Sequence, residues 1–141
     1  LRSEDDGDTW RDVARGDQSV FAMRLANDGS HTGYAVGQEG LMLKTSDDGL
    51  TWERLDVGTN ANLLGVWAGN SEVVVIGIRT LIRSSDDGAS FTSTGDYNIV
   101  RTWFQAVDAG VTESKAGSKG FLRQQIIYIV GHKGTIARVL K

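Results

Sequence analysis

The chain has 141 residues, 40% of them hydrophobic and 23% charged, which is enough for one globular domain with a sizeable core. No apolar run approaches the roughly 20 residues of a membrane-spanning helix, and the absence of cysteine excludes disulfides, thiolate metal ligands and cysteine nucleophiles. The net charge of −3 is unevenly distributed: residues 1–98 carry 8 Lys/Arg and 16 Asp/Glu, whereas residues 99–141 carry 7 and 2.

Short apolar runs separated by Gly, Asn and Asp predict an all-β chain. In chain order, the strands are expected over residues 9–13, 20–25, 33–37, 41–45, 51–55, 63–68, 72–78, 80–84, 90–94, 100–107, 125–131 and 135–140. A helix over residues 19–26 is the one local alternative. Its counterparts at 63–68 and 100–107 are rich in Val and Trp, which favours a strand. Several runs are apolar on both faces, as expected for sheets sandwiched between other sheets.

One eight-residue phrase occurs three times, at residues 3–10, 45–52 and 84–91, with spacings of 42 and 39 residues. A second phrase precedes it at 34–44 and returns at 74–83, one residue shorter, and at 128–138. A period near 40 residues with several short strands is typical of a β-propeller blade. The sequence therefore predicts a partial propeller of about three blades, each a four-stranded antiparallel sheet.

The repeats divide the chain into the end of a preceding blade at 1–17 and blades at 18–57, 58–98 and 99–141. The last blade is expected to lack its fourth strand and to contain an inserted loop at about 108–124. Three blades are too few for a ring, since propellers have four to eight. We expect closure with blades upstream of Leu1 or with a second copy of the chain, as a six-bladed dimer, because unpaired edges invite aggregation.

Each residue of the repeated phrase has a structural role. The Asp should accept hydrogen bonds from backbone amides two residues on, the Gly should take the positive φ of a tight turn, and the aromatic ring should be buried between blades. These turn residues are Asp5, Gly7, Trp10, Asp47, Gly49, Trp52, Asp86, Gly88 and Phe91. A calcium loop is the functional alternative, but the Gly comes too early and no Glu ends the loop. We expect no metal site and no cofactor.

The phrase resembles the Asp box of the bacterial neuraminidase repeat, a motif specific for fold and poor for function. Families that share it include sialidases, xyloglucanase-type glycoside hydrolases, sortilin-like receptors and photosystem II assembly or stability factors. The fuller phrase at 33–52 is most similar to the last group, as are residues 129–136. That resemblance implies a seven-bladed, extracytoplasmic or thylakoid-lumen assembly factor without enzymatic activity. The chain departs from it in the shortened phrase at 77–83 and in the insertion of the last repeat.

The sequence contains no set of residues that matches a known catalytic motif. A sialidase site needs an arginine triad and a Tyr/Glu nucleophile, but the arginines lack the flanking motif, and Tyr34 and Tyr128 occupy equivalent repeat positions, which favours packing. His31 and His132 lie in predicted turns with no visible partner. We therefore expect no catalytic residue and a protein-binding scaffold. The alternatives are a fragment of a sialidase-like or xyloglucanase-like hydrolase and a structural subunit of a larger complex.

A basic residue recurs just before each phrase, at Arg2, Lys44 and Arg83, with Arg138 in the last repeat. The stem of such a residue can pack while its charge reaches water, or the row can dock an acidic protein. The candidate partner-binding residues are Arg83, Arg101, Lys115, Lys119, Arg123, Lys133 and Arg138. The expected partner is a protein with an acidic surface, further propeller blades or another copy of the chain. Nucleic-acid binding is not expected, because the chain is acidic and its basic part lacks interleaved exposed aromatics.

Overall fold

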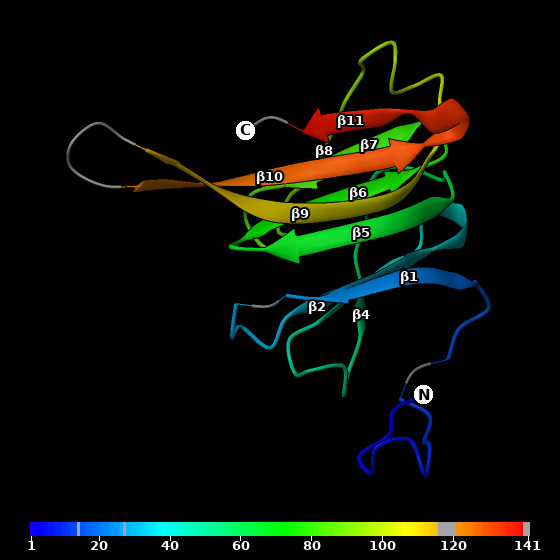
Figure 1. Cartoon of the computed structure of the whole chain (residues 1–141). Coiled ribbons are helices and arrows are strands. Elements are labelled where there is room, and N and C mark those ends of the chain that lie inside the picture. The colour runs from blue at the N-terminus through cyan, green and yellow to red at the C-terminus, as the bar shows by residue number, and fades with distance from the viewer. Residues whose placement is uncertain (14, 27, 116–120, 140–141) are drawn as a thin grey trace.

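The structure is a computed structural model that describes residues 1–13, 15–26, 28–115 and 121–139. These residues form three antiparallel sheets and no α-helix. The sheets lie one behind another in chain order (Figure 1): β5 packs against β1 and β2 on one side and against β9 on the other. The all-β, multi-sheet architecture predicted from the sequence is confirmed.

Two sheets have four strands and one has three, and within each sheet consecutive strands are neighbours. The first contains β1 (Val20–Leu25), β2 (Gly33–Gly37), β3 (Met42–Thr45) and β4 (Glu53–Arg54). The second contains β5 (Leu63–Gly69), β6 (Glu72–Gly77), β7 (Thr80–Ser84) and β8 (Thr92–Ser93). The third contains β9 (Phe104–Lys115), β10 (Phe121–Gly131) and β11 (Ile136–Val139).

In the described part of the chain, helical structure is limited to two 3₁₀ turns, η1 (Gln38–Gly40) and η3 (His132–Gly134), which join the second and third strands of their sheets. No helix among the described residues has the length and apolar character needed to cross a membrane. The strand rather than the helix forms over residues 20–25, as predicted.

The second strand of every sheet ends at an equivalent glycine, Gly37, Gly77 or Gly131. A Cβ at these positions would lie 1.9, 2.2 and 2.1 Å from the carbonyl oxygens of residues 19, 62 and 103, respectively. The backbone therefore approaches too closely for any side chain, and the first strand of each sheet shifts register beside this glycine. Because this irregularity lies at the same place in each sheet, it shows which residues of the three repeats are structurally equivalent.

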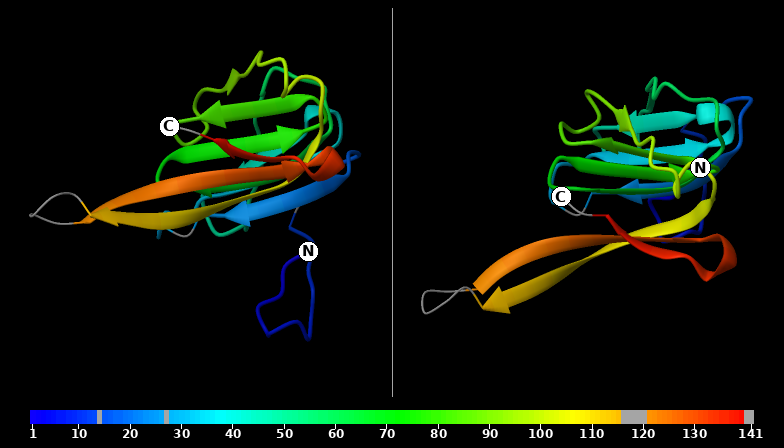
Figure 2. Two further views of the ribbon diagram at one scale, coloured as in Figure 1. Left: turned by 45° about the horizontal axis from the view of Figure 1, so that its top comes forward. Right: turned by 90° about the horizontal axis from the view of Figure 1, so that it is seen from above.

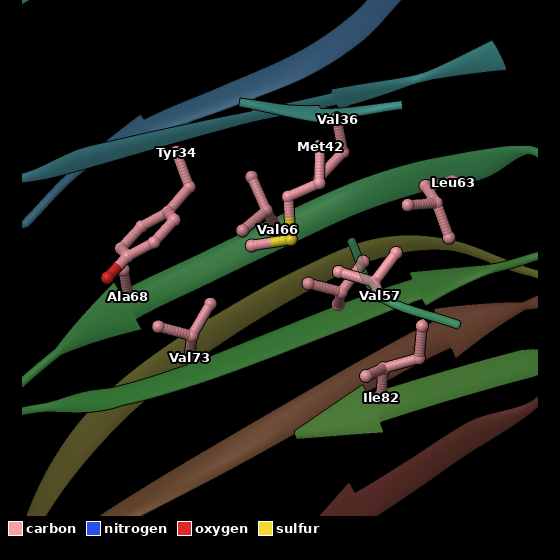
Figure 3. Close-up of a cluster of buried hydrophobic side chains, with 10 residues drawn as sticks. Tyr34, Val36, Met42, Val57, Leu63, Val66, Ala68, Val73 and Ile82 are labelled. Carbon is pink, nitrogen blue, oxygen red and sulfur yellow. The ribbon is translucent and has the colours of Figure 1, made fainter. Parts of the chain in front are cut away.

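Two hydrophobic clusters fill the spaces between the sheets. The first joins Tyr34, Val36 and Met42 to residues of the second sheet that include Val66 and Val73 (Figure 3). The second lies between the second and third sheets, with Trp67, Val74, Ile76 and Leu81 meeting Phe104, Ile127 and Ile129. The second sheet is therefore covered on both faces, which explains why all of Glu72–Gly77 is buried.

The third sheet is covered on one face only. Along β10, Ile127 and Ile129 are buried, whereas Tyr128 and Val130 are exposed. Successive side chains of a strand point to opposite faces, so this alternation identifies a face of the sheet with no neighbour in the structure.

Two strand predictions and one loop prediction were wrong. Residues 9–13 form only an isolated bridge between Arg2 and Arg11, because no sheet edge lies beside them. The strand expected over 100–107 begins at Phe104, since residues 97–101 form turns. The expected loop at 108–124 is largely strand: 108–115 and 121–124 extend β9 and β10 into a long hairpin (Figure 2). Backbone pairing in such a ribbon needs no apolar pattern, so its Gly and polar residues were misleading. Residues 116–120 lie outside the described part of the chain.

Candidate functional site

The three repeated phrases form turns with one hydrogen-bond network, and we call them the acidic turns. In the turn at 45–52, the hydroxyl of Thr45 donates to Asp47 Oδ1 (2.7 Å) and accepts from the backbone N–H groups of Asp47 (3.2 Å) and Gly49 (2.9 Å). Thr51 donates its N–H to Asp47 Oδ1 (2.9 Å) and its hydroxyl to Asp47 Oδ2 (2.6 Å). Both oxygens of the Asp47 carboxylate are therefore held by donors of the same turn.

The acidic turns at 3–10 and 84–91 repeat this network around Asp5 and Asp86. In each turn the residue before the glycine and the glycine itself have positive φ, 57° and 84° at Asp48 and Gly49, as in the tight turns that favour Asp-Gly. The positive φ predicted for the glycine is confirmed. The predicted hydrogen bond from an amide two residues on was wrong: the amide lies four residues on, because the hydroxyl two residues before the Asp takes the nearer amides.

This network changes the acidity of the turn carboxylates. The hydroxyl of Thr51, followed by its amide and by the hydroxyl of Thr45, lowers the pKa of Asp47 to about 2. The equivalent hydrogen bonds, led by Thr9 and by Ser90, lower the pKa of Asp5 and of Asp86 to about 2 as well. These carboxylates are structural anions near neutral pH and are poorly suited to donate a proton as general acids.

The aromatic residues of the turns differ in burial. Trp52 and Phe91 are half-buried, and Phe91 packs against the cluster between the first two sheets. Trp10 is 60% exposed and donates its indole N–H to the carbonyl of Gly7 (3.0 Å). The prediction that all three rings are buried between blades was wrong for Trp10, because its turn has a sheet on one side only.

Two of the basic residues that precede the acidic turns contact the next acidic turn along the chain. Lys44 Nζ donates to the backbone carbonyl of Asp87 in the next acidic turn (2.7 Å), and Arg2 Nη1 donates likewise to the carbonyl of Asp48 (2.9 Å). Arg83 instead pairs with Glu72 (2.5 Å). The sequence suggested that these charges reach water or dock an acidic protein. For Arg2 and Lys44 neither interpretation was complete, since the charged group binds a backbone carbonyl of the following repeat.

Two further contacts anchor the acidic turns to the rest of the fold. His31 Nδ1 lies 2.6 Å from Asp48 Oδ2, and Ser71 donates its hydroxyl to Asp87 Oδ2 (2.9 Å). His31 therefore has a partner that its sequence position did not reveal. No group of three or more His, Asp or Glu residues suited to a metal ion occurs in the described parts of the chain.

A separate set of exposed residues gathers where the turn between β6 and β7, the segment 99–103 and η3 meet. Backbone contacts hold the three segments together: Arg79 donates to the carbonyl of Thr102 (2.8 Å), His132 donates to that of Trp103 (3.0 Å), and Ile78 bridges to Trp103. We call this surface the basic rim; it comprises Ile78, Arg79, Tyr97, Arg101, Trp103, His132 and Lys133.

The basic rim combines positive charge with exposed aromatic and aliphatic surface. The rings of Trp103 and His132 lie 5.3 Å apart, and the Arg101 guanidinium lies 4.9 Å from the centre of the Tyr97 ring. Among the described residues, no carboxylate lies within ion-pair distance of Arg79, Arg101 or Lys133. Such a surface can contact apolar groups and carboxylates of one partner at the same time.

The predicted partner-binding residues do not form one site. Arg101 and Lys133 lie on the basic rim, whereas Arg138 lies on β11 and Arg83 on β7. The backbones of Lys115 and Arg123 belong to β9 and β10, and Lys119 lies outside the described residues. Sequence reasoning missed Arg79, Tyr97 and Trp103. Arg79 could have been found from its position in the repeat, because it occupies the same turn position as Glu39 and Lys133, and all three have a positive φ.

Antiparallel sheets that lie one behind another in chain order, each with the same glycine and all but the last with an acidic turn, define this chain as part of a β-propeller. The fold is similar to a solved structure of YCF48 bound to D1 peptide, with a TM-score of 0.64 and 20% sequence identity over 86% of this chain. The chain spans 36% of the length of that structure. No family model and no curated protein matches the chain.

Proposed function

We propose that this chain is a non-enzymatic, protein-binding scaffold of the Asp-box propeller type, similar to photosystem II assembly factors, and that its basic rim binds acidic peptides. The rim carries the proposal, because backbone contacts bring the segments that carry the exposed residues Arg79, Arg101 and Lys133 together with that of the partly exposed Trp103. The structural neighbour was solved with a bound peptide, which supports a peptide or protein partner. We also propose an extracytoplasmic location, which the resemblance of residues 33–52 to photosystem II assembly factors implies and which fractionation of the source cells would test.

A scaffold role agrees with the chemistry of the acidic residues. The carboxylates of Asp5, Asp47 and Asp86 are saturated by hydrogen bonds of their own turns. They stabilise their turns and offer no free carboxylate pair of the kind that glycoside hydrolysis requires. We therefore propose that the chain carries no catalytic centre of its own.

Fluorescence anisotropy with a short labelled peptide of alternating Glu and Leu tests the proposal. We expect saturable binding that weakens with salt, and no binding of a matched peptide with Lys in place of Glu. Arg101→Glu and Lys133→Glu should each weaken binding by about five- to tenfold, since each reverses one unpaired charge of the rim.

Arg24→Glu is the matched control, because it makes the same charge change at an exposed residue of β1, away from the rim. Equal effects of Arg24→Glu and Arg101→Glu would show that only net charge matters and would refute the rim as the site. Equal binding of the Glu and Lys peptides would refute the proposal that the ligand is acidic.

A further inference from the structure

Each sheet presents one exposed charged residue at the same point of the turn that follows its second strand. These residues are Glu39 after β2, Arg79 after β6 and Lys133 after β10. Each lies two residues after the equivalent glycine and has a left-handed backbone, with φ of 51°, 56° and 55°, respectively. Because the conformation is shared, the three side chains leave the backbone at the same end of the molecule, where η1 and η3 lie on the right in Figure 1. We call these three residues the charge row.

The charge row crosses three consecutive sheets, and its charges are negative, positive and positive in chain order. The cores on either side of the second sheet contain residues of the second strands themselves, so β2, β6 and β10 lie in sheets packed face to face. Sheets packed in this way are about 10 Å apart, which sets the spacing of neighbouring charges. An extended peptide advances about 3.3 Å per residue, so every third residue meets the next charge of the row.

Hydrogen bonds at this end fix the charge row to the fold. The backbone N–H of Glu39 donates to Asn62 Oδ1 (3.0 Å), just before β5, and that of Arg79 donates to the carbonyl of Thr102 (2.8 Å), just before β9. Each of these two turns is thereby tied to the segment that enters the following sheet. The spacing of the row is therefore set by the packing of the sheets.

The charges of the row are available to a partner. Among the described residues, no ion pair involves Glu39, Arg79 or Lys133. A hollow of about 380 Å³ beside Glu39 is also lined by Asp56 and Arg54, so it holds two carboxylates and one guanidinium. The hollow has room for a long basic side chain and keeps a negative balance of charge.

An aromatic residue lies between the two positive charges of the row. The carbonyl of Thr102 accepts from the backbone of Arg79, and that of the next residue, Trp103, accepts from the backbone of His132 beside Lys133 (3.0 Å). Trp103 is 39% exposed. A peptide that joins Arg79 to Lys133 therefore passes over apolar surface between its two charged contacts.

We infer that the partner segment crosses the charge row in extended conformation, with a basic residue at Glu39 and acidic residues three and six positions further along at Arg79 and Lys133. An apolar residue between the two acidic ones contacts Trp103. The inference rests on the proposed function, since Arg79 and Lys133 belong to the basic rim, and it specifies which acidic segments the rim binds. Glu39 acts in it as the residue that rejects a third acidic contact.

Fluorescence anisotropy of the whole chain with labelled nine-residue peptides tests the inference. In the matching peptide, Lys, Glu and Glu follow one another at three-residue spacing, with Leu between the two Glu residues and Ser elsewhere. A peptide of the same composition and spacing, in the order Glu, Lys, Glu, should bind about tenfold more weakly, because two attractive contacts of exposed charges are lost. Shortening the spacing to two residues should weaken binding about fivefold.

Glu39→Lys should change the preference at the first position of the peptide. This variant should bind a Glu, Glu, Glu peptide of the same spacing at least about fivefold more tightly than the Lys, Glu, Glu peptide. Asp8→Lys is the matched control: it makes the same charge change in an acidic turn, at a position where the other acidic turns carry Leu50 and Ala89. It should leave the wild-type preference unchanged, and circular dichroism checks that both variants are folded.

The outcomes separate a failure of the charge row from a failure of the proposed function. If no peptide binds, the proposed function is refuted and the inference is overturned with it. If acidic peptides bind but the Lys, Glu, Glu and Glu, Lys, Glu orders bind equally, the basic rim stands and the charge row alone is overturned. Equal changes of preference for Glu39→Lys and Asp8→Lys would overturn it in the same way, since only net charge would then matter.

Discussion

Removing the Tyr34 hydroxyl tests how the acidic turns connect the sheets. Tyr34 is 1% exposed, and its hydroxyl donates to the Asp87 carbonyl at 2.7 Å. Tyr34→Phe deletes that bond and leaves the packed ring in place. One intramolecular hydrogen bond contributes about 0.5–1.5 kcal/mol, so the free energy of unfolding should fall by about that amount. For a chain of this size the melting temperature should fall by roughly 2–5 °C.

The shared acceptor makes the Tyr34 effect depend on Lys44. With either donor removed, the Asp87 carbonyl retains the other; with both removed, it retains neither. Tyr34→Phe combined with Lys44→Met should therefore cost more than the sum of the single variants, measured by urea unfolding in a double-mutant cycle. Tyr128→Phe is the matched control and should change stability by less than about 0.5 kcal/mol, because that ring is exposed.

Two results would contradict this account of the shared carbonyl. Additive single effects, to within about 0.3 kcal/mol, would show that Tyr34 and Lys44 act independently. Equal losses of unfolding free energy for Tyr34→Phe and Tyr128→Phe would show that the hydrogen bond from the Tyr34 hydroxyl to the Asp87 carbonyl contributes nothing to stability. Burial raises the pKa of Tyr34 to about 12, so the hydroxyl remains a donor throughout the neutral range used for these measurements.

Four further predictions concern the turns, the sheets, and the expected absence of calcium binding and of hydrolytic activity. The acidic-turn carboxylates have a folded pKa of about 2 against 3.8 unfolded, so their stabilisation is full above about pH 4 and is lost as pH falls toward 2. The urea midpoint should drop over that window, and Asp47→Asn should flatten the drop; an unchanged profile would speak against this. Gly77→Ala should cost about 1–3 kcal/mol in urea unfolding, because its Cβ would lie 2.2 Å from the Asn62 carbonyl, whereas Gly95→Ala, with open space around it, should be neutral. Calorimetry should detect no calcium site, and a stoichiometric site that vanishes with Asp47→Ala would refute the structural role of the turns. Fluorogenic sialosides and β-glucans should show only background hydrolysis; turnover abolished by one carboxylate substitution would identify an enzyme.

Local signals in the sequence were sufficient for the strands with strong apolar character and for the turns. Val20–Leu25 and Thr80–Ser84 formed as predicted, because β-branched and apolar residues between turn signals favour strands regardless of what covers them. The glycine conformation in the acidic turns was also predictable, since positive φ is a property of the residue itself. Local signals failed over residues 108–115 and 121–124, where pairing in a long hairpin overrides Gly and polar residues.

The basic rim was only partly predictable. Arg101 and Lys133 stood out as part of a basic region, but Arg79 and Trp103 are far from Lys133 in sequence and meet it only through backbone contacts between three segments. A repeat alignment places Arg79 and Lys133 in equivalent turns. It gives no indication that Trp103 lies outside the strand and that its ring contacts that of His132 at a tilt of 53°.

The sequence by itself determined the repeat, the antiparallel strands and the residues of the acidic turns, because these depend on period, propensity and turn chemistry over a few neighbouring residues. Only the tertiary structure decided what those residues contact. Tyr34 and Tyr128 occupy the same repeat position, yet one is buried with its hydroxyl bound to Asp87 and the other is exposed. The difference arises because burial depends on whether another sheet lies against that face, which no local pattern encodes.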